Sequence, residues 1–572
     1  KDGKAYSIKP TDGTGDFTFS RGSNLSATRV NSSQLIEKGR ENLLLQSNQF
    51  DTTWTNVNTT ETSGQSGYDG SNDAWLLSKS AASARIEQSV SQSGVLTFSV
   101  FAKAGTLNWI RLNVDTAWAF YDLANGVVGS DINNIIDHNI YDIGGGWYRC
   151  ELVINFTASI CRIYPAQNDG DVGGTSGNIV IQDSQLESSL IATDVIETTT
   201  TTGKAGILED TPRFDYLGAS CPSLLLEPSR TNFVPFSEYI GSAWNPFGNT
   251  SVNANDSTSP EGVINATKIS ATATATSNVG IQDGFSVSAG TEYTVSFFAK
   301  KTDFRYIQLF HGGAQVSSNA RTNFDIQEGL VAYEESGVVS ASIEDYGNGW
   351  YRCIATMEAL LSTLQTYIIA ASTATASRGA AISATAGDSY QIFGIQVEAG
   401  SYATSYIPTM GVSQTRAKDI SSVAGASAVI GSTEGTIFLE VAALANDLSE
   451  RRFALSNGTT GNVVRVGFTN VSNRILAVLY NGANQCVLTY NGVDITSKNK
   501  IAFAYNTNDF TLFVNGQERA TDTSGSTFSA NTLTDVHFNE GDGNGNESFG
   551  KFDEVILFKT RLSDTDLATL TT

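Results

Sequence analysis

Three aromatic side chains, Trp109, Trp118 and Tyr306, have the chemistry to hold a ring-shaped polar ligand. Aromatic faces stack on pyranose rings, and neighbouring polar groups then fix the orientation of the sugar. Trp118 has no obvious counterpart elsewhere in the chain, which makes it the preferred exposed candidate. Other tryptophans occur in matched pairs, which favours a role as buried core anchors over ligand contact: Trp54 with Trp244, and Trp147 with Trp350.

A second group of residues near the C-terminus has the spacing of metal ligands. Asp542, Asn544 and Asn546 alternate, and Asp553 lies eleven residues beyond Asp542, as in a calcium-binding loop. The sixth position of such a loop is normally glycine, whereas here it is Glu547. A β-turn rich in glycine and asparagine explains the run equally well. The sequence therefore indicates Ca²⁺ as a candidate cofactor and gives no sign of another.

No catalytic residues are predicted. The three histidines, His138, His311 and His537, fall in three different parts of the chain, whereas a nucleophile and its base must lie within hydrogen-bond reach. A glycosidase needs only a pair of carboxylates, but Glu187 and Glu398 stand at matching positions of a repeat and fit a structural role better. We therefore expect a non-enzymatic protein, with cleavage of polysaccharide kept as an alternative.

Composition and charge narrow the class of protein. The 572 residues include 53 glycines and only 16% charged residues, and they are rich in strand-forming Thr, Val, Ile, Tyr and Phe, which favours an all-β fold with tight turns. The net charge of −23 argues against binding to nucleic acid or to anionic membrane surfaces. Apolar runs long enough to cross a membrane are absent from the sequence, so membrane insertion is not expected. The five cysteines form no CxxC pair and are expected to be free, buried thiols.

Two long stretches of the chain repeat each other, with their landmarks in the same order over about 160 residues. The separation between matched residues is 190 at the start and grows to 197, 203 and 211, as expected for one fold with small loop insertions. We therefore predict a duplicated domain. The matched landmarks are Arg40 with Arg230, Asn42 with Asn232, Ser47 with Ser237, residues 97–103 with 294–300, residues 146–150 with 349–353, Gln185 with Gln396, and Glu187 with Glu398.

The repeat unit has the pattern of a β-sandwich. In residues 97–103 and 294–300, apolar side chains alternate with Thr and Ser, which predicts strands with one face buried and the other in water. Short strands separated by turns over about 150 residues are typical of a two-sheet jelly roll.

A different pattern of strands begins near Gly435. Strands are predicted at 436–441, 463–468, 475–480, 500–505 and 510–514. Asn515 and Gly516 predict a type I′ hairpin turn, and Ser563 before two acidic residues predicts a capped short helix. This last part reads as a second kind of sandwich.

The chain thus divides into six segments. These are an N-terminal docking or lead-in segment (1–39), jelly-roll module 1 (40–199), an inter-module linker (200–229), jelly-roll module 2 (230–410), a second linker (411–434) and a C-terminal sandwich (435–572).

The duplicated unit resembles the carbohydrate-binding-like jelly-roll modules of bacteriophage tail and head proteins. Residues 42–54, 101–103, 146–150 and 396–409 carry this resemblance, although residues 194–196 depart from the matching 405–407 and lack the proline that follows them. The C-terminal sandwich is similar to laminin-G and concanavalin-like lectin domains, on residues 500–516 and 552–564. The expected fold is therefore all-β, with two tandem jelly rolls followed by a lectin-like sandwich.

These resemblances imply a protein of the virion surface, on the tail or the capsid exterior. It would be a tail-fibre, head-fibre or adhesin component that binds host-surface polysaccharide, contacts other virion proteins and forms a homo-oligomer. The first alternative is a purely structural capsid or tail decoration protein that binds only other virion proteins, and the second is a polysaccharide depolymerase.

Overall fold

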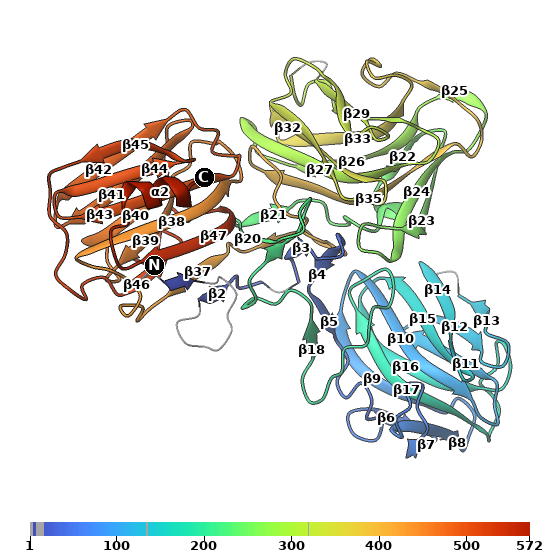
Figure 1. Ribbon diagram of the computed structural model, residues 1–572. Coiled ribbons are helices and arrows are strands. Elements are labelled where there is room, and N and C mark those ends of the chain that lie inside the picture. The colour runs from blue at the N-terminus through green and yellow to red at the C-terminus, as the bar shows by residue number, and fades with distance from the viewer. Residues whose placement is uncertain (1–3, 7–16, 24, 133–134, 318–319) are drawn as a thin grey trace.

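Three β-sandwiches make up the molecule (Figure 1). The computed structural model describes residues 4–6, 17–23, 25–132, 135–317 and 320–572. Its described helices are two short ones, α1 (Ile240–Ala243) and α2 (Asp564–Leu570), so the predicted all-β class is confirmed. Neither helix is long and apolar enough to cross a membrane, within the part of the chain that is described.

The first sandwich has two six-stranded antiparallel sheets. One runs in the order β14 (Asp137–Gly144), β15 (Trp147–Asn155), β10 (Val95–Ala104), β17 (Asn178–Glu187), β8 (Ala74–Lys79) and β7 (Thr59–Gln65). The other runs in the order β13 (Val127–Asp131), β12 (Ala117–Asp122), β11 (Trp109–Val114), β16 (Ala158–Ala166), β9 (Arg85–Gln92) and β6 (Thr55–Val57).

The second sandwich repeats this arrangement strand for strand. Its first sheet is β31 (Ser340–Asp345), β32 (Trp350–Ala359), β27 (Thr291–Lys301), β35 (Ser389–Ala399), β24 (Ile264–Ala271) and β23 (Thr250–Thr258). Its second sheet is β30 (Leu330–Glu334), β29 (Arg321–Asp325), β28 (Tyr306–His311), β33 (Thr363–Ala371), β26 (Val279–Ser286) and β22 (Asn245–Gly248), and β25 (Ala275–Ser277) pairs with β34 (Ile382–Ala384) beside them.

Repeated side chains make the same contacts in both sandwiches. Glu187 accepts hydrogen bonds from the backbone N–H (2.8 Å) and hydroxyl (2.7 Å) of Thr193, while Glu398 accepts from the backbone N–H (2.9 Å) and hydroxyl (2.7 Å) of Thr404. These carboxylates therefore hold the loop that follows the last strand, which is the structural role that the repeat predicts. The paired tryptophans are buried as predicted: Trp54, Trp147, Trp244 and Trp350 are exposed by 3% or less.

The alternation predicted that the Thr and Ser face of the repeated strand lies in water. This prediction is wrong, because the structure buries that face. Thr97 and Ser99 in β10 are 0% and 1% exposed, and their counterparts in β27 are equally buried. The reason is that the chain after β17 folds back over this face, where the Thr97 hydroxyl donates to the carbonyl of Ser189 (2.8 Å). Alternation distinguishes the two faces of a strand, but it does not say which covering the outer face will receive.

The third sandwich takes strands from segments that lie far away in the sequence. One sheet is β19 (Phe214–Asp215), β20 (Ser223–Leu226), β47 (Gly550–Phe558), β38 (Glu434–Ala443), β43 (Asn499–Asn506), β44 (Asp509–Val514) and β45 (Gln517–Asp522), with β1 (Lys4–Tyr6) also paired to β47. The other is β2 (Thr18–Ser20), β37 (Ile420–Val423), β46 (Asp535–His537), β39 (Arg451–Ser456), β40 (Asn462–Phe468), β41 (Arg474–Asn481) and β42 (Asn484–Asn491).

The lead-in and linker segments are thus structural parts of this third sandwich. Phe17 and Phe19 from the N-terminal segment, Leu224 from the first linker and Val423 from the second all lie in its hydrophobic core. Figure 1 accordingly places the N-terminal end of the chain beside the third lobe. The predicted hairpin is confirmed by the positive φ of Asn515 and Gly516, and the predicted helix cap by the Ser563 hydroxyl, which accepts from the N–H of Asp566.

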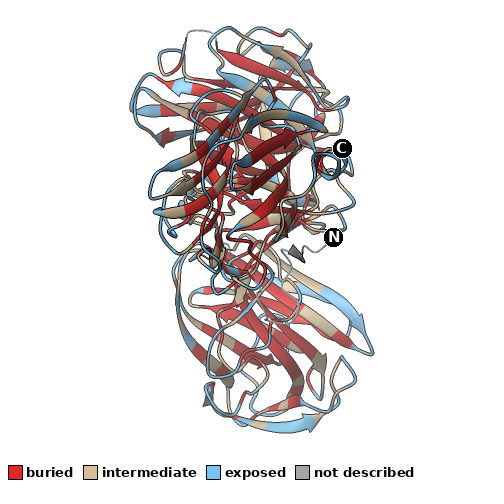
Figure 2. Cartoon of the chain, turned by 60° about the vertical axis from the view of Figure 1, so that its left-hand side comes forward, coloured by how far each residue is buried: buried red, intermediate tan, exposed pale blue. Residues whose placement is uncertain are grey.

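Short two-stranded pairs connect the three sandwiches. They are β3 (Thr28–Val30) with β4 (Ile36–Lys38), β5 (Arg40–Asn42) with β18 (Gly203–Ala205), and β21 (Arg230–Asn232) with β36 (Gln414–Arg416). Figure 2 shows buried residues in red. They fill the cores of the sandwiches and continue into the region between the lobes.

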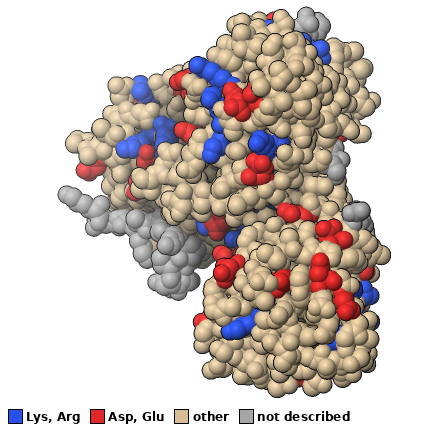
Figure 3. Space-filling view, turned by 90° about the vertical axis from the view of Figure 1, so that its right-hand side faces the viewer, with Lys and Arg blue, Asp and Glu red and all other residues tan. Residues whose placement is uncertain are grey.

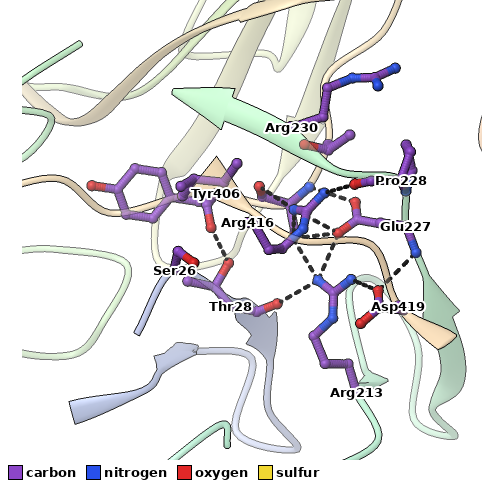
Figure 4. Close-up of polar contacts among 12 residues, drawn as sticks. Ser26, Thr28, Arg213, Glu227, Pro228, Arg230, Tyr406, Arg416 and Asp419 are labelled. Atoms are coloured by element: carbon purple, nitrogen blue, oxygen red, sulfur yellow. Dashed lines mark hydrogen bonds and ion pairs between the residues drawn. The ribbon is translucent and has the colours of Figure 1, made fainter. Parts of the chain in front are cut away.

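A buried network of ion pairs lies in this junction (Figure 4). The Arg213 guanidinium, whose side chain is 0% exposed, is bound to Glu227 (2.6 Å) and to Asp419. Arg416 also contacts Glu227 (2.9 Å), and Arg21 also contacts Asp419 (3.1 Å). Because these five residues come from the N-terminal segment and from both linkers, the network fixes all three segments at one point.

A second buried cluster joins the N-terminal segment to the second sandwich. The Lys38 ammonium lies 2.8 Å from Glu238 and 2.9 Å from Glu261. Burial and the neighbouring charge of Glu261 raise the pKa of Glu238 to about 7, against the opposite effect of Lys38. Two carboxylates thus share one ammonium, so this part of the junction is sensitive to proton concentration.

Candidate ligand-binding face

The second sheet of the first sandwich carries a row of aromatic and charged side chains on its outer face. In β11, Ile110, Leu112 and Val114 are fully buried toward the core, so Trp109 and Arg111 project from the opposite face of the sheet. This is the expected consequence of the two-residue period of a strand. The apolar positions on either side of Arg111 therefore place its guanidinium outside the core.

The strand register brings the outward side chains together. Arg111 lies opposite Phe120 in β12 and opposite Tyr164 in β16. Asn113 lies opposite Trp118 on one side and Arg162 on the other. We call this surface the arginine–aromatic face. It consists of Arg85, Glu87, Arg111, Trp118, Phe120, Arg162 and Tyr164.

Trp118 is the partly exposed ring of this face. It is half-buried, whereas Phe120 is 2% exposed and Tyr164 is 5% exposed. Its ring packs edge-on against Phe120, with 5.4 Å between centroids and an interplanar angle of 83°. The buried ring thus supports the partly exposed one, which leaves Trp118 available for stacking against a flat ligand.

Three guanidinium groups lie on the same side of the sheet as these rings. The Arg111 guanidinium carbon is 4.0 Å from the centroid of the Tyr164 ring, a cation–π contact. Arg85 and Arg162 both contact the carboxylate of Glu87, at 2.7 and 3.0 Å. Partial burial opposes ionisation of Glu87, but the hydrogen bonds from the two arginines prevail and lower the pKa of its carboxyl.

Trp109 lies at the rim of the face and not at its centre. A Cβ atom added to Gly129 would be 2.5 Å from the Trp109 ring, so the ring packs closely against this part of β13. Asp169, from the loop after β16, accepts a hydrogen bond from the backbone N–H of Ser130 (2.7 Å). This loop therefore borders the face at the Trp109 end.

The equivalent face of the second sandwich is covered. Gln308 and Asn323 lie in the places of Arg111 and Phe120, and the Gln308 amide donates to the carbonyl of Ala376 (3.1 Å). Arg321, in the place of Trp118, also donates to this carbonyl (2.9 Å). Residues 372–381 thus lie over the sheet and occupy the area that the first sandwich leaves open.

Tyr306 occupies the position of Trp109 beside this covered face. It lies opposite Asp325 in β29, as Trp109 lies opposite Asp122 in β12. The guanidinium carbon of Arg305 is 5.3 Å from its ring centroid, and Arg305 pairs with Asp325 (2.6 Å). The sequence candidates are therefore divided between two sheets, with Trp109 and Trp118 on one and Tyr306 on the other.

The predicted calcium ligands have separate partners. Asp542 accepts from the backbone N–H of Asn544 (2.9 Å), and Asn546 donates to Glu450 and Glu540. The carboxylate of Asp553 instead contacts Ser223 and Lys498. Among the described residues, no hydrogen bond or ion pair joins Asp553 to the other three, and no group of three His, Cys, Asp or Glu side chains is arranged for a metal ion. Calcium binding stays a prediction.

Sequence reasoning missed most of this face. The alternation in residues 109–114 could have identified Arg111 as an outward cation, because it separates two apolar residues. Arg162 and Tyr164 carry a similar alternating pattern, but their position beside Arg111 depends on the pairing of β11 with β16. That pairing joins residues about fifty positions apart and has no local signal.

A partly open cavity lies elsewhere, at the junction. This cavity of about 270 Å³ is lined by Asp215, Glu344 and Lys551 among others, and Lys551 pairs with Asp215 (3.0 Å). The arginine–aromatic face is by contrast an open surface of a sheet. An open surface suits a stretch of an extended chain, whereas a small cavity suits a compact molecule.

Comparisons with known proteins give only distant likeness. No protein-family model matches the chain, and no curated protein matches it. Among solved structures, it is similar to the carbohydrate-binding module (CBM40) of the Ruminococcus gnavus IT-sialidase bound to alpha2,3 sialyllactose, with 18% identity over 26% of this chain and 86% of that one and a TM-score of 0.23. It is also similar to the tandem CBM22 domains of Paenibacillus barcinonensis Xyn10C, with 12% identity over 66% of this chain and 100% of that one and a TM-score of 0.20.

Proposed function

We propose that this chain is a non-enzymatic surface protein of a bacteriophage particle that binds glycans of the host surface. The contact would be made by the arginine–aromatic face of the first sandwich. The observation that carries the binding proposal is the half-buried ring of Trp118, which is supported by Phe120 and has the Arg111 guanidinium 5.9 Å from its centroid. The place on a virion rests on the sequence resemblances to phage fibre modules.

The physical properties of this face support the proposal. A half-exposed indole offers apolar area to the C–H face of a sugar ring, and the arginines offer N–H donors to its hydroxyl oxygens. Both sets of groups stand on strands of one sheet, so they are held in place before the ligand arrives and less conformational entropy is lost on binding. Figure 3 shows one side of the molecule, on which charged side chains are scattered among wide uncharged areas.

Binding of the full chain to a panel of host-surface and capsular polysaccharides tests this proposal. The wild type is expected to bind at least one of them, and Trp118→Ala is expected to weaken that binding about fivefold, because stacking of one aromatic ring contributes on the order of 1 kcal/mol. Tyr306→Ala is the matched control, since it removes an aromatic ring beside the covered sheet, and it is expected to bind as the wild type does.

Two outcomes would contradict the binding proposal. One is the absence of binding to every glycan of the panel, and the other is a Trp118→Ala variant that binds as well as the wild type. Release of new reducing ends from a bound polysaccharide would contradict the non-enzymatic role. Immunogold labelling of phage particles tests the virion position, and failure of an antibody against this chain to label intact particles would contradict it.

A further inference from the structure

The arginine–aromatic face has more positive than negative charge, although the whole chain carries a net charge of −23. Three arginines, Arg85, Arg111 and Arg162, lie on it, and the carboxylate that neutralises part of their charge is that of Glu87. Both ion pairs to Glu87 come from Arg85 and Arg162, which leaves Arg111 as the cation without an acidic partner within the described chain.

The surroundings of Arg111 are aromatic and neutral. Its guanidinium carbon is 4.0 Å from the Tyr164 ring centroid and 5.9 Å from that of Trp118. One of its terminal nitrogens donates to the side-chain oxygen of Asn113 (3.3 Å), while its buried Nε has no hydrogen-bond acceptor among the described residues. A partly buried cation in such a place is poorly compensated, because rings and amides replace only part of its hydration.

The neighbouring charges also disfavour the charged form of Arg111. Burial is the main cause that lowers the pKa of Arg111, and the charges of Arg162 and Arg85 act in the same direction against the favourable effect of Tyr164. The charged form of this side chain would thus be favoured by an added anion. A guanidinium offers a planar fork of donors that matches the two oxygens of a carboxylate or a sulfate.

In the second sandwich the side chain at the same position is hydrogen-bonded within the chain. Gln308 stands in the place of Arg111, and its neutral amide makes hydrogen bonds to Asn323 (2.7 Å), Ala376 (3.1 Å) and the N–H of Gly379 (2.7 Å). The position is therefore satisfied internally in one copy of the fold and holds an only partly compensated cation in the other.

We infer that the glycan bound by the first sandwich is acidic, and that a carboxylate or sulfate on the sugar pairs with Arg111 while the sugar ring lies on Trp118. This inference rests on the proposed function and names the class of its ligand. The distance of 5.9 Å between the guanidinium carbon and the Trp118 ring centroid is comparable to the width of one sugar ring, so a single acidic residue can contact both groups.

Matched pairs of polysaccharides test the inference with the full chain. Polygalacturonate, alginate and polysialate are each compared with their carboxyl-methylated forms, and dextran sulfate is compared with dextran. The wild type is expected to bind at least one acidic member about tenfold or more tightly than its neutral partner, and to lose this preference at high salt, because salt screens an exposed ion pair.

Two variants test whether Arg111 causes the preference for acidic polysaccharides. Arg111→Gln is expected to weaken binding of the acidic member about tenfold and to leave binding of the neutral member unchanged. Folding of this variant is supported by the glutamine at the same position of the second sandwich. Arg305→Gln is the matched control, because Arg305 also lies over an aromatic ring but is paired with Asp325, and it is expected to bind as the wild type does.

The outcomes separate this inference from the proposed function. Equal binding of acidic and neutral members, or binding of neutral glycans alone with a requirement for Trp118, overturns the inference and keeps the proposed function. Unchanged preference for the acidic member in Arg111→Gln also overturns it. Absence of binding to every glycan, acidic or neutral, overturns both.

Discussion

Replacing Arg213 by methionine is expected to loosen the junction of the three sandwiches. The side chain of Arg213 is fully buried and holds Glu227 at 2.6 Å and Asp419 on its other side. Removing one partner of a buried ion pair costs about 3–5 kcal/mol, because the remaining charge stays out of water. Since Glu227 keeps Arg416 and Asp419 keeps Arg21, the lower end of the range applies, which is about 3 kcal/mol.

Hydrogen exchange of the native protein measures this loss locally. A change of about 3 kcal/mol increases the population of the open state by more than about 100-fold, and the increase is expected in β20 and β37, which flank Glu227 and Asp419. Arg29→Met is the control, because Arg29 belongs to the same N-terminal segment but pairs with Glu37 where both side chains are partly exposed, at 21% and 25%, so loss of this pair costs less than loss of the buried one. Unchanged exchange of β20 and β37 in Arg213→Met would refute the reasoning.

Three further changes test other parts of the structure. Phe19→Ala should destabilise the third sandwich by about 3 kcal/mol or more, since it empties a core site that is 7% exposed. Chemical denaturation, followed by hydrogen exchange of β38 and β47, measures this loss. An unchanged denaturation midpoint would contradict the assignment of Phe19 to that core. Gly94→Ala should separate the first two sandwiches, because its Cβ would lie 2.0 Å from the carbonyl oxygen of Met410. Small-angle scattering should then show a larger radius of gyration. A scattering profile identical to that of the wild type would argue against this contact. The pKa of Glu238 is raised from 4.5 to about 7, so the folded state binds the proton more tightly than the unfolded state and the free energy of unfolding falls as pH rises through that interval. Glu261→Gln should reduce this dependence of the free energy of unfolding on pH. Denaturation series at several pH values measure it, and an unaltered pH dependence would count against the reasoning.

The duplicated sandwich could be predicted from the sequence because its landmarks are local and repeated. Residues 97–103 and 294–300 have the same alternation, and the loop-binding carboxylates Glu187 and Glu398 recur with the same neighbours. Each copy folds by the same local rules, so the two patterns support each other. The same holds for the turn at Asn515, where the turn type requires a positive φ that asparagine and glycine adopt readily.

The organisation of the third sandwich could not be predicted in this way. Strands β1, β2 and β20 have three or four residues each and pair with strands hundreds of positions away. Such short segments show no measurable periodicity, and their pairing is decided by the edges that the other strands leave open. Segments that look like linkers by composition can therefore complete a core.

The binding face could be predicted from the sequence only in part. Trp118 could be identified as a candidate because it has no counterpart in the repeat, but its neighbours Arg111 and Tyr164 come from two other strands. The sequence also gives no sign that residues 372–381 cover the equivalent face of the second sandwich. Duplication predicts equal folds, whereas loops of different length decide which copy keeps an open surface.

Hydroxyl-radical footprinting of the full chain, with and without a saturating bound polysaccharide, tests the central claim most directly. The reasoning predicts that the ligand protects the partly exposed Trp118 from oxidation and leaves Tyr306 and Tyr367 of the second sandwich unchanged. Protection confined to the second or third sandwich, with Trp118 oxidised at the same rate in both samples, would contradict the arginine–aromatic face as the binding site.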